Sequence, residues 1–138
     1  MPRTKRDFFA ARGPCTLAPE EVKRRLYAAS CKGAIAEVRW LLTAPGVNPN
    51  TPLEDGVTAL MMASLHGHIK TVRALLGVRG VNANCRGDVE WTDGRTPLVY
   101  ASARGRLDVV KALVASRIDV NVPDVYGNTP LHHAAERG

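Results

Sequence analysis

One phrase occurs three times along this chain, and it constrains the fold more than any other feature of the sequence. The copies cover residues 55–67, 93–105 and 126–138, and a fainter copy covers residues 26–33. Their threonines, Thr58, Thr96 and Thr129, lie 38 and 33 residues apart. Self-similarity at such a period predicts a stack of small supersecondary units, each burying its apolar face against the next.

The residue types within the phrase suit the two ends of a short helix. The threonine hydroxyl can cap the helix, and proline follows it in two copies at the first helical position, where a missing N–H costs nothing. The closing glycine can adopt the left-handed conformation that ends a helix and reverses the chain. A second apolar pattern follows, as in Ile69, Val72, Leu75 and Leu76, which marks one face of another helix. The sequence therefore predicts helix, tight turn, helix and loop in every unit.

The last copy reads Gly-x-Thr-Pro-Leu-His-x-Ala-Ala-x-x-Gly between Gly127 and Gly138, and it resembles the ankyrin repeat. The resemblance implies an all-α fold, an ankyrin-repeat solenoid of helix-turn-helix units with β-hairpin-like finger loops. It covers residues 18–138, after a basic and flexible N-terminal tail at 1–17. We expect a capping unit at about 18–50, further units at about 51–84 and 85–121, and a partial fourth unit at 122–138.

The chain departs from this pattern in two ways. Met61 and Val99 stand where the family usually has histidine, so we expect only His132 to make the polar contact typical of that position. The segment 86–91 is an insertion, which we expect to lengthen the β-hairpin finger ahead of the third phrase. Loops that break the spacing of a repeat often carry binding residues.

Charge and hydropathy limit the classes of partner. The chain has 19 Lys and Arg against 13 Asp and Glu, a net charge of +6, and half of that surplus lies in the first twelve residues. The remainder is modest, so the charge does not favour nucleic acid as the partner. No apolar run approaches the roughly 18 residues of a membrane span, and no secretory signal is recognisable. We expect a cytoplasmic location, with a nuclear one as the alternative.

The residues that could carry chemistry do not form a known catalytic or metal-binding motif. The three cysteines have no zinc-type spacing, and the histidine pairs His66/His68 and His132/His133 lack further ligands nearby in the sequence. The chain also has no glycine-rich phosphate loop, nucleophile elbow or HExxH pattern. We therefore expect no catalysis, no cofactor, no metal and no small-molecule substrate.

The remaining function is recognition of a protein, either a folded surface or a peptide. The resemblance implies that the fingers and the first helices form a concave face whose varied positions contact the partner. Tryptophan, tyrosine and arginine there are the types that dominate interface energetics. The predicted contact residues are Glu54, Asp55, Val57, Leu65, His66, Trp91, Thr92, Asp93, Arg95, Ala103, Arg104, Val125, Tyr126, Asn128, Glu136 and Arg137.

Two functions stay open at this point. The first is a non-catalytic scaffold or adaptor that binds a partner protein. The alternative is a regulatory or substrate-recruiting domain of a larger enzyme, such as a kinase or a ubiquitin-ligase component, whose catalytic part lies beyond residue 138. Binding of nucleic acid through the net charge is a third reading, and it predicts an affinity that falls steeply with salt.

Overall fold

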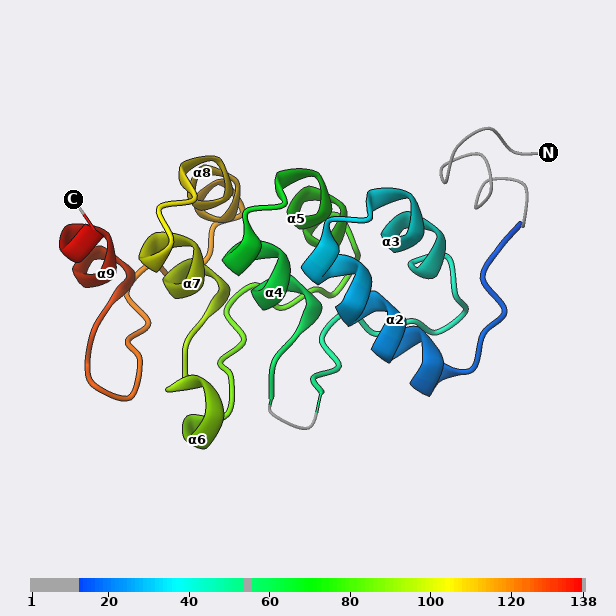
Figure 1. Cartoon of the computed structure of the whole chain (residues 1–138), viewed down its shortest axis with the longest axis horizontal. Coiled ribbons are helices and arrows are strands. Elements are labelled where there is room, and N and C mark those ends of the chain that lie inside the picture. Colours follow the sequence, from blue (N-terminus) through cyan, green and yellow to red (C-terminus); the bar gives the residue numbers. More distant parts are fainter. Residues whose placement is uncertain (1–12, 54–55, 138) are drawn as a thin grey trace.

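The helices form two rows, with loops projecting below them (Figure 1). The structure is a computed structural model that describes residues 13–53 and 56–137, without the side chains of Val89 and Trp91. The inner row comprises α2 (Pro19–Lys32), α4 (Ala59–His66), α7 (Pro97–Ala103) and α9 (Pro130–Arg137). The outer row comprises α3 (Ile35–Leu41), α5 (Ile69–Leu76) and α8 (Leu107–Ala115), and the short α6 (Val89–Thr92) lies in a loop.

Each helix packs mainly on its own partner and on the equivalent helices of the neighbouring units. In the inner row α2 packs on α4, α4 on α7 and α7 on α9, while in the outer row α3 packs on α5 and α5 on α8. The hairpins α2–α3, α4–α5 and α7–α8 join the two rows. This arrangement confirms the predicted all-α solenoid of helix-turn-helix units, in which each unit contacts only its neighbours.

The ends of the inner helices follow the predicted chemistry. The Thr58 hydroxyl accepts a hydrogen bond from the Met61 amide at 3.3 Å, and Thr96 accepts one from Val99 at 3.3 Å. Pro97 occupies the first helical position of α7. The capping unit lacks such a side-chain cap because Ala18 has no acceptor to offer.

The glycine that closes each inner helix also makes room for the next unit. Gly67 has a φ of 73°, and a Cβ added to it would lie 2.7 Å from Cδ of Arg106. The Arg106 side chain crosses this glycine and donates from Nε to the carbonyl of Leu65 at 3.3 Å. The equivalent neighbours are His68 at Gly33 and Arg137 at Gly105. The glycine is thus required both for the left-handed turn and for the close approach of units.

Two apolar layers stabilise the stack. The larger lies between inner and outer helices and takes the same positions from successive units, among them Leu26, Leu60, Leu98, Leu41, Leu75 and Leu113. The smaller lies between the inner helices and the fingers, and its buried members are Val57, Met61, Met62 and Tyr100. We call the loops that precede α4, α7 and α9 the second, third and fourth fingers (residues 47–58, 85–96 and 120–129).

The base of each finger is closed by a hairpin-like backbone bond. The amide of Leu53 donates to the carbonyl of Val57 at 3.0 Å, and the third and fourth fingers close at Gly87–Arg95 (3.0 Å) and Asp124–Asn128 (2.9 Å). None of the described residues forms a β-strand.

The insertion lengthens the third finger as predicted, but its residues form a helical turn and not an extended β-hairpin. The Asp88 side chain caps α6 by accepting from the Glu90 amide at 2.8 Å, and the Thr92 amide donates to the Asp88 carbonyl at 2.9 Å. The backbone groups of the insertion thereby find partners locally and need no partner strand.

The N-terminal segment 13–17 packs on the outer helix α3 and is not part of a free tail. Cys15 is fully buried, and its amide donates to the Thr43 hydroxyl at 2.8 Å. The Trp40 indole donates to the carbonyl of Gly13 at 2.8 Å. Residues 1–12 of the expected tail lie outside the described residues.

The C-terminal side of the solenoid exposes apolar positions that earlier units cover. Leu131 of α9 is 77% exposed, whereas the equivalent Leu98 of α7 is buried. Leu107 and Val114 of α8 are exposed as well, because no described helix packs on the far side of α8.

We expect Gly56→Ala to lower the free energy of unfolding by about 2–4 kcal/mol, measured by urea denaturation. Gly56 has a φ of 75°, and an added Cβ would lie 2.5 Å from the backbone nitrogen of Asp88 in the third finger. The matched control is Gly46→Ala, at a φ of 69° with open space around it, for which only the backbone strain of about 1–2 kcal/mol is expected. Equal losses in the two variants would show that the contact between fingers contributes nothing.

Candidate protein-binding surface

The third and fourth fingers lie side by side and present one continuous surface. The Val125 amide donates to the Asp93 carbonyl at 2.8 Å, which joins the two backbones. Asp93 has a φ of 54° and ends α6 in the left-handed conformation. The helical turn in the insertion therefore turns the chain so that Asp93 reaches the next finger.

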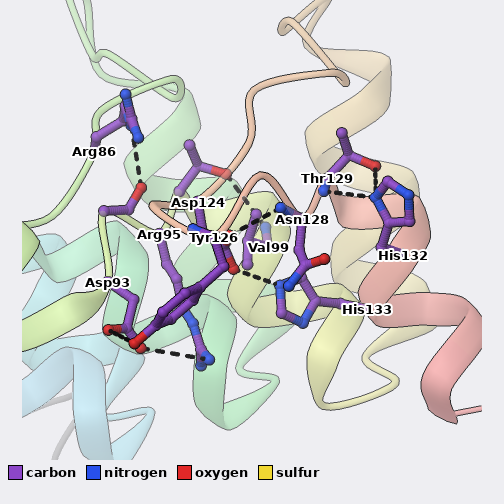
Figure 2. Close-up of polar contacts among 12 residues, drawn as sticks. Arg86, Asp93, Arg95, Val99, Asp124, Tyr126, Asn128, Thr129, His132 and His133 are labelled. Carbon is purple, nitrogen blue, oxygen red and sulfur yellow. Dashed lines mark hydrogen bonds and ion pairs between the residues drawn. The ribbon is translucent and has the colours of Figure 1, made fainter.

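Exposed and half-buried side chains on this junction contact one another (Figure 2). Tyr126 is 71% exposed, and its hydroxyl donates to Oδ1 of Asp93 at 3.4 Å. The Arg95 guanidinium lies 3.7 Å from Oδ2 of the same carboxylate. We call Asp93, Arg95, Val125 and Tyr126 the fingertip patch.

A buried carboxylate fixes the loop that carries Tyr126. Oδ1 of Asp124 accepts from the amides of Tyr126 at 3.0 Å and Asn128 at 2.9 Å, and Oδ2 lies 2.9 Å from Nε2 of His133 in α9. Burial by itself raises the pKa of Asp124, but these hydrogen bonds and the charge of His133 outweigh it and hold the pKa below its ordinary value. The fourth finger is thereby tied to α9 through one side chain.

His132, which precedes His133 in the sequence, makes the contact expected from the resemblance. Nδ1 of His132 accepts a hydrogen bond from the Thr129 amide at 2.9 Å and lies 2.9 Å from the Thr129 hydroxyl. This confirms the structural role predicted for His132, at the start of α9.

Two of the predicted contact residues are buried, and their assignment to an exposed surface was wrong. Val57 is only 4% exposed because it belongs to the layer between inner helices and fingers. Thr92 is 6% exposed because its hydroxyl turns inward and donates to the Asp88 carbonyl at 2.6 Å. Glu54 and Asp55 lie outside the described residues, and Trp91 lies in α6 with its side chain undescribed.

The remaining predicted residues fall into two groups instead of one surface. Beyond the fingertip patch, His66, Arg104, Glu136 and Arg137 are exposed at or just after the C-terminal ends of the inner helices. Leu65 and Ala103 on the same helices are half-buried, and Leu65 packs on the layer beneath the fingers. Asn128 is half-buried, and its backbone amide donates a hydrogen bond to the carboxylate of Asp124.

Sequence reasoning missed the residues that support the patch. Asp124 is the clearest case, although an aspartate three residues before a glycine is a usual turn signal and could have identified it. Arg86 is the second case, because its Nε donates to the Gly94 carbonyl at 3.2 Å and braces the third finger. His133 could not be separated from His132 by type or spacing alone.

The described residues offer little to covalent or metal chemistry. They contain no group of three or more His, Cys, Asp or Glu side chains that could hold a metal ion. Burial raises the pKa of Cys85, and a hydrogen bond with Thr58 offsets only part of that rise. Burial likewise raises the pKa of Cys31. Both thiols are therefore poor nucleophiles. No helix in the described part has the length and apolar character needed to cross a membrane.

We expect Asp124→Asn to lower the free energy of local opening of residues 124–137 by about 1–3 kcal/mol at pH 7, measured by amide hydrogen exchange. Because the folded pKa of Asp124 is lowered, its carboxylate stabilises the fold above the ordinary value of 3.8, and this contribution is lost as the pH falls through the folded pKa. The difference between variant and parent should therefore shrink below that pH. Asp119→Asn is the control, since exposed Asp119 only bonds the Asn121 amide at 2.9 Å. A difference that persists in acid would contradict the role of the Asp124 charge.

Comparison with known proteins agrees with this geometry. The family model described as ankyrin repeats (3 copies) matches residues 26–124 and, in a second match, residues 78–138. No curated protein matches the sequence. Ankyrin repeats are generally protein–protein interaction modules and are typically non-catalytic. With matches that span most of its length and helix pairs that stack as repeats, the chain belongs to the ankyrin repeat family.

Proposed function

We propose that this chain is a non-catalytic scaffold or adaptor that binds a partner protein mainly through the fingertip patch. The observation that carries the proposal is Tyr126, which is 71% exposed while Asp93 and Asp124 hold its hydroxyl and its backbone. An aromatic side chain fixed in this way loses little conformational entropy when a partner covers it.

The composition of the patch suits a protein surface. Tyrosine and arginine are enriched among the few residues that dominate binding energy, and Tyr126 and Arg95 lie beside each other around Asp93. Exposed Val125 adds apolar area next to Tyr126. An apolar centre with one carboxylate and one guanidinium at its edge fits a folded surface or peptide with complementary polar groups.

The exposed cations at the ends of the inner helices would contribute chiefly to the rate of association. Arg104 and Arg137 lie beyond the patch on the same row of helices, and no described acidic side chain forms an ion pair with either. Charges at the rim of an interface steer encounter more than they add affinity. A recruiting domain of a larger enzyme, the alternative function, would use the same surface.

We expect Tyr126→Ala to weaken binding of a partner protein, first isolated by pull-down with this chain, by about 2 kcal/mol, roughly thirtyfold, measured by calorimetry. The substitution removes the exposed ring while Asp124 still fixes the loop backbone. Lys111→Ala on the outer helix α8 is the control and should bind like the parent. A normal affinity for Tyr126→Ala together with a loss for Lys111→Ala would move the binding surface to the outer helices.

We expect the double variant Arg95→Ala with Arg104→Ala to slow association several-fold at low salt while changing dissociation less. Arg95 belongs to the fingertip patch and Arg104 follows the C-terminal end of α7, and both positive charges attract an oppositely charged partner before contact. Surface plasmon resonance at two ionic strengths separates the two rates. A change confined to dissociation would mean that these arginines act as buried anchors.

A further inference from the structure

The outer helices carry a cation at one fixed position in every complete unit. Arg39, Arg73 and Lys111 each lie four residues after the first residue of α3, α5 and α8. All three side chains are exposed. Because α3 packs on α5 and α5 on α8, these exposed cations at equivalent positions form a row along the outer helices.

A groove with apolar lining residues lies along this row, between α3 and α5. Arg39, Lys70 and Arg73 line it together with Ile35, Ala36 and Ala74, and Gly13 and Pro14 of the N-terminal segment line it as well. Its volume is about 920 Å³. None of the described residues that line it is acidic. Ion pairs between described residues involve other cations, and the one acidic residue of α3, Glu37, is held by Arg25 at 2.7 Å.

The helix dipole does not account for all three cations that line the groove, Arg39, Lys70 and Arg73. Arg39 and Arg73 lie in the last turns of their helices, where the negative end of the helix dipole stabilises a positive charge. Lys70 lies in the first turn of α5, where the dipole disfavours a cation and no acidic residue offsets it. Lys70 therefore adds positive charge to the groove at a cost to its own helix.

We propose that the α3–α5 groove docks an acidic amphipathic helix of a partner protein. The floor of Ile35, Ala36 and Ala74 would receive the apolar face, and the three cations would pair with carboxylates that flank this face. Helices of seven and eight residues are about 10–12 Å long, so the contact would involve about two turns of the partner.

Two other classes of anionic partner fit the groove less well. Stacking of nucleic-acid bases needs exposed aromatic rings, whereas Trp40, the only aromatic residue among the described residues that line the groove, is 7% exposed. Insertion into a membrane interface needs large exposed apolar side chains, and those of the described part lie on α8, α9 and the fourth finger.

The test uses the whole chain with Trp91→Phe, which leaves Trp40 as the single tryptophan. The probe is a fluorescein-labelled synthetic peptide of about 14 residues with leucines on one helical face and glutamates beside it. Anisotropy should show saturable binding, and Trp40 emission should change in parallel because Trp40 lines the groove. The triple variant Arg39→Glu, Lys70→Glu and Arg73→Glu should bind at least about tenfold more weakly.

The control variant carries Arg24→Glu, Lys32→Glu and Arg79→Glu, which changes the net charge equally at exposed positions outside the groove. Its affinity should stay within about twofold of the parent. Lys70→Glu alone covers the case in which the triple variant unfolds, since a carboxylate suits the first turn of α5, and it should weaken binding about threefold or more.

Several results would overturn the proposal. Equal binding of a scrambled peptide with the same composition would show that the groove recognises charge without an apolar face. An equal loss in the control variant would show an effect of net charge alone. Groove-dependent binding of duplex DNA or of phosphatidylserine vesicles, with no binding of the peptide, would assign the groove to another class of partner.

Discussion

The close approach of neighbouring units at the inner-helix turns is the constraint on which the rest of the structure depends. Gly67 leaves space for Arg106 of the next unit, and this side chain bonds the Leu65 carbonyl across the junction. That spacing brings equivalent positions of successive helices into one core layer, and it brings the fingers close enough for the backbone of Asp93 to bond Val125. A wider spacing would open the core and separate the fingers together.

The two proposed surfaces belong to different parts of this stack, the fingers and the outer helices (Figure 1), and different interactions dominate in each. The fingertip patch relies on a preorganised aromatic ring, whose loop is fixed by the buried carboxylate of Asp124. The α3–α5 groove relies on cations around an apolar floor, placed in register because the repeat puts Arg39 and Arg73 at the same helical position. A chain with both surfaces could hold two partners at once, as a scaffold requires.

Prediction from the sequence succeeded where local chemistry decides the structure. A threonine before a short apolar run caps a helix, and a glycine at its end reverses the chain, whatever else the fold contains, so Thr96 and Gly67 were assigned correctly. It failed where burial depends on neighbouring segments. Val57 and Thr92 occupy positions that are varied and exposed in the general pattern, yet the layer beneath the fingers and the turn of α6 enclose them here.

The sequence by itself determined the helical units, their order and the side-chain class at each repeated position, because propensity, capping and apolar periodicity act within about a dozen residues. Only the tertiary structure decided which of those side chains meet. The contact of Tyr126 with Asp93 joins residues 33 positions apart, and the groove of Arg39 and Arg73 exists only after α3 packs on α5. Such sites depend on the distance between units, which is set by packing across the whole stack and is not encoded in any single repeat.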